Sequence, residues 1–371
     1  AACHGPFLTV QIAGHLGLGR YIMFYDSNDI QLSHETSVAT SEDTARKYEA
    51  WGWHVQTIDG GNVEAIRGAL RNAVADEQRP SIIIGKTVMG KGAVTEDGAG
   101  FERQCSTHGM PLSKAGASFE RTVTNLGGDP ADPFRVFPEV AEHFATVKRD
   151  KAAAAAEHRK QQAVWEKANP EPAAKLTRFL DGRTVDVDFA AIEQKSGIAT
   201  RAASGAVLAV LARSVENMIV CSADLSNSDN TGAFLKQTTA FGRGDFTGQF
   251  LQIGVSELTM AAAVNGMALH GGVIPACGTF FVFSDYMKPA VRLAAMMGLQ
   301  TVYVWTHDAF RVGEDGPTHQ PVEQEAQIRL LEHLRNHSGD RSMLVLRPAD
   351  GTESAVAWKM ALENRKTPTA L

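Results

Sequence analysis

The sequence predicts an α/β fold of two tandem domains, each with a doubly wound parallel sheet, joined by a helical linker. In residues 12–88 and again in 199–371, short runs rich in β-branched residues alternate with amphipathic helical stretches. Such alternation is typical of parallel sheets covered by helices. Between these parts lies a stretch rich in Ala, Lys, Glu and Gln with few large apolar residues, which predicts an exposed helix. A third observation is a polar loop after a predicted strand near residue 307, because open α/β sheets place ligand sites after their strands.

Length and composition indicate a protein of two or more domains without nucleic-acid or membrane partners. The chain has 371 residues, of which 44% are hydrophobic and 21% charged, and its formal charge is 36 − 42 = −6. The acidic balance argues against nucleic acid, and no apolar run approaches the roughly 18 residues of a membrane span. The four cysteines are far apart in the sequence without a CxxC pair, so we expect free thiols and a cytoplasmic location. The sequence starts without Met and ends in PTAL, which predicts the opening of a strand, so we expect both ends to lie inside a longer protein.

The first half predicts strands and helices in alternation. Ser41 is a good N-cap for the helix after the first strand, and Gly52 ends that helix. The predicted order is a helix ending in residues 12–19, a strand in 20–29, a helix from 44, a strand at 54–59, a helix at 61–76 and a strand at 80–88.

The composition changes between residues 133 and 181, where the linking helix is predicted and NPEP ends it. We place a partial first domain at residues 1–150, a helical linker at 151–184 and a second domain at 185–371. In the second domain, strands and helices are again expected in alternation. The first half of it predicts a helix at 199–215, a strand with its exit loop at 218–232, a strand and helix at 250–272, and a strand and helix at 276–297. The rest predicts a strand at 301–306, a helix at 322–333, a strand at 342–348 and a helix at 351–364.

The loop HDAFRVGEDGPTHQPVE, residues 307–323, follows the predicted strand TVYVWT. Its glycines and Pro317 break regular structure, and a helix is expected to begin near Pro321 with Glu323 at its positive end. The alternative is an ordinary solvated loop. A ligand site is favoured because six titratable groups fall within thirteen residues: His307, Asp308, Arg311, Glu314, Asp315 and His319.

Three other stretches carry polar residues that admit two interpretations. Asn28 ends a predicted strand, where its amide oxygen can reach a hard cation, although SND alone is typical of a turn. The segment GKTVMGKG has the wrong order for a phosphate-binding Walker loop, and His108 alone is an ordinary loop histidine. Glu257 interrupts a small, apolar stretch, where burial favours a protonated or paired acid and a helix start favours a carboxylate.

The form GEDGPTHQPVEQ, with THD six residues before it, resembles the signature of transketolases, which are thiamine-diphosphate enzymes. The resemblance runs from about Ile12 to the last residue, and residues 1–11 do not fit it. It implies two domains of the thiamine-diphosphate-binding type: part of a diphosphate-binding domain and most of a pyrimidine-binding domain. The Gly-Asp-Gly motif of the family, whose aspartate binds the metal, is missing, as is the third domain of the family.

The resemblance implies thiamine diphosphate and Mg²⁺ or another divalent cation as cofactors. The metal ligands are then Asn28 and the carbonyl oxygen of Ile30. Glu257 would bond N1′ of the aminopyrimidine and activate the cofactor. The other cofactor-binding residues implied are Lys86, His108, Asp224, Phe283 and Tyr286, the last two by stacking; together with Phe280 these two rings also fit an ordinary core.

The implied reaction is transfer of a two-carbon ketol group from a ketose phosphate to an aldose phosphate. His319 and His307 would contact the substrate hydroxyls or the donor carbonyl. The implied substrate-binding residues are Arg201 and Ser228 at the phosphate, Asp315 at the sugar chain, and His108. The resemblance also implies a homodimer with the active site at the subunit interface.

Two other functions remain open on the sequence. One is an inactive piece of a transketolase, which folds or dimerises without catalysis because the charged metal ligand is missing. We accordingly expect residues 1–371 alone to bind thiamine diphosphate poorly. The other is a deoxyxylulose-phosphate synthase-like enzyme, against which the full GEDGPTHQPVE form and the long linker argue.

Overall fold

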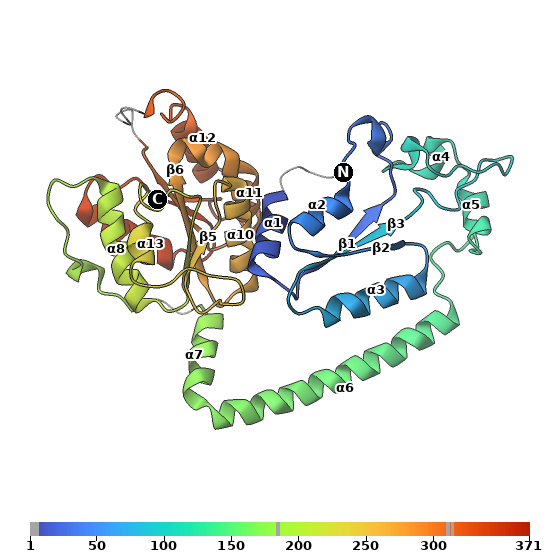
Figure 1. The fold of residues 1–371 in the computed structure, drawn as a ribbon, viewed down its shortest axis with the longest axis horizontal. Coiled ribbons are helices and arrows are strands. Elements are labelled where there is room, and N and C mark those ends of the chain that lie inside the picture. The colour runs from blue at the N-terminus through green and yellow to red at the C-terminus, as the bar shows by residue number, and fades with distance from the viewer. Residues whose placement is uncertain (1–6, 183–185, 309–311, 313–314) are drawn as a thin grey trace. The chain divides into compact units, whose positions relative to one another are not determined.

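The computed structural model describes residues 7–182, 186–308, 312 and 315–371. Contacts divide the chain into two compact units, and the division falls within helix α1 (Phe7–Leu16) and between Ala168 and Asn169. Each unit contains one sheet whose described strands all run parallel (Figure 1). The predicted α/β class with two parallel-sheet domains is therefore confirmed.

The first unit is built on a three-stranded sheet in the order β1-β3-β2. Its central strand, β3, pairs with a strand on each edge, and its side chains along SIIIG are buried on both faces of the sheet, which explains the continuous apolar run. Asp43, not Ser41, caps the following helix: its carboxylate accepts from the backbone N–H of Arg46. The elements are β1 (Ile22–Ser27), α2 (Thr44–Ala50), β2 (His54–Asp59), α3 (Val63–Ala75) and β3 (Ser81–Lys86).

Short helices follow the sheet of the first unit. They are η1 (Thr36–Val38), which lies between β1 and α2, and then η2 (Cys105–Thr107), α4 (Leu112–Ala115) and α5 (Phe119–Asn125).

A long helix, α6 (Pro138–Ala168), follows and buries none of its residues, as its composition predicts. NPEP ends it as expected but also starts another helix, α7 (Pro170–Leu180), with proline in its first turn. Proline lacks the N–H that the first turn leaves unpaired, so the same segment stops one helix and opens the next.

The second unit is built on a six-stranded sheet in the order β5-β4-β6-β7-β9-β8. Its central strands β6 and β7 are buried at every position. The strands are β4 (Met218–Ser222), β5 (Phe250–Gln252), β6 (Ile274–Phe280), β7 (Val302–Thr306), β8 (Leu344–Val345) and β9 (Thr369–Ala370).

Helices cover both faces of this sheet: α8 and α13 on one, and α10 and α11 on the other (Figure 1). The core between the sheet and α8 and α13 centres on Trp358, whose indole N–H donates a 2.9 Å hydrogen bond to the Ser204 hydroxyl. The helices are η3 (Phe189–Ala191), α8 (Thr200–Ser214), α9 (Gly232–Leu235), α10 (Glu257–His270), η4 (Phe281–Phe283), α11 (Ser284–Met297), α12 (Gln324–His333) and α13 (Gly351–Glu363).

The predicted start of a helix near Pro321 is wrong, because α12 begins three residues later, at Gln324. The N–H of Val322 donates to the side-chain oxygen of Gln324, and a bend occupies residues 322–323. The Gln324 amide is buried and donates to Asp285 at the start of α11 over 2.9 Å, which fixes the helix start against a neighbouring helix.

Candidate active site

Three strand exits hold a non-glycine residue in the left-handed backbone region. They are Asp29 (φ 63°) after β1, Asp224 (φ 65°) after β4 and His307 (φ 55°) after β7. This conformation brings Cβ close to the backbone and persists only where surrounding contacts hold it, as happens at functional sites. Within each unit, the carboxyl ends of these strands are therefore where candidate functional residues lie.

The imidazole of His307 stacks on Phe280, with ring centroids 3.7 Å apart and an interplanar angle of 27°. Its Nδ1 lies 2.9 Å from the hydroxyl of Thr306. Burial lowers the pKa of His307, electrostatic interactions with Arg201 and His319 lower it further, and Asp315 and Asp308 act in the opposite direction. The ring is therefore neutral at physiological pH and can accept or donate a hydrogen bond.

Five rings from the exits of β6 and β7 form a continuous group, which we name the ring cluster. His319 completes it: its ring lies 5.3 Å from that of Phe283, edge to face, and 6.1 Å from that of Phe280. The Tyr286 ring extends the cluster outward, 62% exposed and 6.1 Å from Phe283. The members are Phe280, Phe283, Tyr286, His307 and His319. The structure thus brings together four residues that the sequence assigned to the cofactor or the substrate, on a platform of aromatic faces.

Glu257 is the first residue of α10 and is only 8% exposed. Burial raises its pKa, while its own backbone N–H and the side chain of Thr279 act in the opposite direction. Both sequence interpretations hold, because the acid is buried and also stands at a helix N-terminus. Desolvation is the larger effect, so this carboxyl group is disposed to keep a proton that it can donate.

The loop after β4 carries Asp224, which is exposed, and Ser228, which is partly buried. The buried Asp229 beside them, missed by the sequence analysis, accepts hydrogen bonds from the Ser222 hydroxyl at 3.1 Å and from the N–H and hydroxyl of Thr231 at 2.8 and 2.7 Å. Burial raises its pKa, partly offset by these donors. A side chain at Gly278 would come within 2.8 Å of its carboxylate, so a glycine there lets β6 approach this loop.

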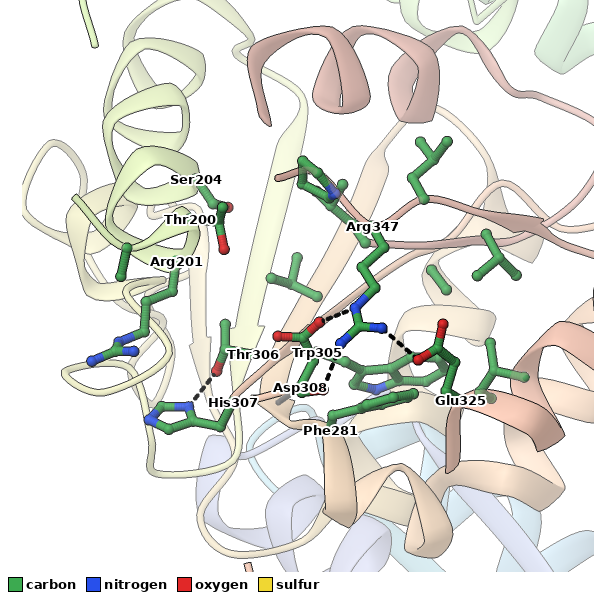
Figure 2. A pocket seen from close by; sticks show the side chains of 18 of the residues that line it. Thr200, Arg201, Ser204, Phe281, Trp305, Thr306, His307, Asp308, Glu325 and Arg347 are labelled. Carbon is green, nitrogen blue, oxygen red and sulfur yellow. Dashed lines mark hydrogen bonds and ion pairs between the residues drawn. The ribbon is translucent and has the colours of Figure 1, made fainter. Parts of the chain in front are cut away.

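A cavity of about 420 Å³ opens beside the exit of β7 (Figure 2). Arg201, at the start of α8, lines it together with His307 and Asp315. On another wall Arg347 is paired with Asp308 and Glu325. No sequence pattern had singled out Arg347 or Glu325, because the pairing joins three segments distant in the chain. Arg201 thus presents a guanidinium, a group suited to a phosphate, to the same cavity as an imidazole and a carboxylate.

In the first unit, the exit of β1 holds Asn28 and the buried Ile30. The amide oxygen of Asn28 accepts from the N–H of Ile30 at 3.0 Å, which fixes this turn. Lys86, at the end of β3, donates to the Ser27 hydroxyl at 2.8 Å and lies 3.4 Å from the Asp29 carboxylate. His108 follows η2 and is partly buried.

These residues fit an anionic cofactor better than a metal ion held by the chain alone. Lys86 and Arg103 supply positive charge around Asp29, at 3.4 and 4.0 Å. Across the described ranges, no three His, Cys, Asp or Glu side chains are grouped so as to hold a metal. Asn28 and the Ile30 carbonyl are oxygen donors of the type that Mg²⁺ takes, but both are uncharged.

Two of the titratable residues predicted for the loop after β7, Arg311 and Glu314, lie outside the described residues.

Two cysteines that are far apart in the sequence, Cys221 and Cys277, are register partners on the neighbouring strands β4 and β6. Both are free and buried, and burial raises the pKa of each thiol. No described helix combines the length and apolar character needed to cross a bilayer.

Two family models match the chain. One, described as "Transketolase, thiamine diphosphate binding domain", matches residues 7–185, and the other, "Transketolase, pyrimidine binding domain", matches residues 196–371. The first match begins at residue 7, so the expectation that residues 1–11 do not fit the family is wrong for residues 7–11.

Similar proteins agree with these matches. The chain is 42% identical to a transketolase of Geobacillus stearothermophilus and 40% identical to one of Bacillus subtilis, each over 368 residues. A solved transketolase of Leishmania mexicana aligns with a TM-score of 0.87 at 33% identity, and one of Pichia stipitis with sedoheptulose-7-phosphate aligns with a TM-score of 0.86 at 32%. Each comparison covers 98% of this chain and 52% of the other, so the chain spans about half the length of the relatives it matches. The chain therefore belongs to the transketolase family and carries its thiamine diphosphate binding and pyrimidine binding domains.

Proposed function

We propose that this chain supplies the cofactor-binding domains of a transketolase, which transfers a two-carbon ketol group from a ketose phosphate to an aldose phosphate. The observation that carries the proposal is Glu257, a buried acid with a raised pKa at the start of α10. Such an acid can share its proton with a ring nitrogen, which an ordinary surface carboxylate cannot do at neutral pH.

Thiamine diphosphate, when bound, supplies a thiazolium carbon that can carry the ketol group and act as electron sink. Glu257 would hold a proton at its carboxyl oxygen and donate it to N1′ of the aminopyrimidine. Phe283 and Tyr286, at the outer part of the ring cluster, offer their faces for stacking on that ring. These three residues lie at the exits of β5 and β6, the neighbours of β4 in the sheet.

His307 and His319 would bind the substrate hydroxyls or the donor carbonyl, and Asp315 would bind the sugar chain. A neutral His307, with its lowered pKa, can donate one N–H to an oxygen without charging the site. Arg201 and Ser228 would bind the phosphate, since a guanidinium pairs with phosphate oxygens through two donors. The sugar-phosphate complex of the Pichia stipitis enzyme supports this substrate class.

The diphosphate and its Mg²⁺ ion would lie against the first unit. Asn28 and the Ile30 carbonyl would provide two of the oxygen ligands, and Lys86 and His108 would face the diphosphate. Asp224 would contact the cofactor. We further propose a homodimer with the active site at the subunit interface, a cytoplasmic location, and the domain boundaries 1–150, 151–184 and 185–371.

Calorimetry of thiamine diphosphate with and without Mg²⁺, together with a ketol-transfer assay, tests the proposal. Both measurements should use the polypeptide at its full natural length beside residues 1–371. We expect Mg²⁺-dependent binding and transfer between phosphorylated sugars by the full-length polypeptide. Binding without transfer would contradict the catalytic assignment, and no binding would contradict the cofactor site as well.

A further inference from the structure

Arg347 connects three segments at the exit of β7 (Figure 2). Its Nε donates to the Asp308 carboxylate at 2.6 Å, and its Nη2 donates to the Asp308 backbone carbonyl at 3.1 Å. Its remaining Nη1 donates to Glu325 in the first turn of α12. One planar guanidinium thus holds both the side chain and the main chain of the residue that follows His307.

These contacts of Arg347 affect the backbone conformation at Asp308 more than the free energy of unfolding. The three side chains are between 35% and 45% exposed, and ion pairs so accessible to water contribute little to folding. A guanidinium that donates hydrogen bonds to both the carboxylate and the carbonyl of one residue does, however, restrict the backbone dihedral angles of that residue.

The restriction falls next to a residue with an uncommon backbone conformation. His307 has a φ of 55°, in the left-handed region that few non-glycine residues adopt and that persists where surrounding contacts hold it. The ring of His307 contacts the Thr306 hydroxyl and stacks on Phe280. Arg347 holds the next residue, Asp308 (Figure 2). Arg347 therefore holds the main chain after His307 by contacts from a distant segment.

We propose that Arg347 is a positioning residue, which holds the peptide of Asp308 and thereby keeps the His307 imidazole stacked on Phe280 in the ring cluster. A loss of catalytic rate on substitution of Arg347 is expected only if the proposed function, in which His307 binds the substrate, is correct. A displacement of the His307 ring is expected whether or not that function is correct, so the two effects can be tested separately.

The matched control is Arg329→Gln. Arg329 belongs to the same group of charges and pairs with Glu325 and Glu332, but its interactions do not include Asp308. Arg347→Gln removes the guanidinium, and Arg347→Lys keeps the charge but reaches only one of the two Asp308 acceptors at a time.

The first measurement is the NMR spectrum of ¹³C,¹⁵N-histidine in the full chain, with His307 assigned from the spectrum of His307→Gln. A ring stacked face to face on Phe280 should give an upfield-shifted signal. We expect that shift to disappear in Arg347→Gln, to be reduced in Arg347→Lys and to persist in Arg329→Gln. An unchanged His307 signal in both Arg347 variants would overturn the proposal, and the lysine variant decides the matter if the glutamine variant does not fold.

The second measurement is kcat/KM for ketol transfer in the full-length enzyme. A displacement of about 1 Å in a positioned group costs up to roughly 100-fold in rate, so we expect Arg347→Gln to lose about 10- to 100-fold, Arg347→Lys less, and Arg329→Gln under about twofold. Equal losses in Arg347→Gln and Arg329→Gln would overturn a specific role for Arg347. Absence of ketol transfer in the unsubstituted enzyme, with the NMR result as expected, would overturn the proposed function and support the positioning.

Discussion

The phenol of Tyr303, the second residue of β7, donates a 2.7 Å hydrogen bond to the side-chain oxygen of Asn265 in α10. The amide of Asn265 in turn donates to the carbonyl of Ala290 in α11 at 2.8 Å. This buried chain of hydrogen bonds joins β7, the strand that precedes His307, to α10, the helix that begins at Glu257. Two buried hydrogen bonds therefore help to fix the position of His307 relative to Glu257.

Tyr303→Phe should lower the free energy of unfolding by about 1–3 kcal/mol, because the buried oxygen of Asn265 loses its donor. Chemical denaturation of the full chain measures this change. Tyr21→Phe, which removes an exposed phenol, serves as the control and should change stability by less than about 0.5 kcal/mol. Equal effects of the two substitutions would mean that the Tyr303 hydroxyl has no structural role.

Glu257→Gln should fold normally and lose ketol transfer by about 10²- to 10⁴-fold, since an amide cannot share its proton with a ring nitrogen as the acid does. The rate of the full-length enzyme with saturating cofactor measures this loss. Glu363→Gln, at an exposed position of α13, is the control and should keep full activity. A Glu257→Gln enzyme with more than about a tenth of the original rate is incompatible with an acid–base role for this residue.

The stability of Glu257→Gln relative to the natural chain should depend on pH. Because burial raises the folded-state pKa of Glu257, its favourable contribution is complete below the ordinary pKa of 4.5 and is lost as pH rises through the folded-state pKa. Glutamine stays neutral throughout. The melting temperature of the variant minus that of the natural chain should therefore increase as the pH rises from about 4 to about 8. Melting curves at several pH values measure the difference, and a constant difference would show that the acid is not shifted.

Arg201→Ala should raise KM for phosphorylated sugars while leaving KM for unphosphorylated ones nearly unchanged. A charge-assisted contact is worth about 1.5–3 kcal/mol, which corresponds to roughly 10- to 150-fold in affinity. Steady-state kinetics of the full-length enzyme with both substrate types measures this effect. Equal changes for the two would remove Arg201 from the phosphate site.

Asp229→Ala should destabilise the chain by roughly 2–5 kcal/mol, because it leaves the Ser222 hydroxyl and both donors of Thr231 unpaired in the core. Denaturation curves measure the loss. Asp229→Asn, which keeps one acceptor oxygen, should lose less. If the two variants are equally stable, the hydrogen bonds of Asp229 are not what holds this loop.

The sequence by itself determined the class of the fold and the segments that carry the site. Apolar runs such as SIIIG and VYVWT identify central strands, because a strand covered on both faces has no polar side to alternate with. The polar residues after such strands follow from the same rule, since strand exits are where an α/β sheet leaves backbone and side chains open to a ligand. Glu257 could be singled out for the same local reason, as an acid within an apolar stretch.

Only the tertiary structure decided which of these residues meet and how they are held. The stacking of His307 on Phe280, the Asp229 network and the grip of Arg347 on Asp308 join segments separated by 7 to 39 positions in the sequence. The start of α12 at Gln324 also depends on Asp285, 39 residues away. Periodicity and spacing report the local conformation of a chain, whereas these contacts depend on the order of strands in the sheet, which brings distant exits side by side.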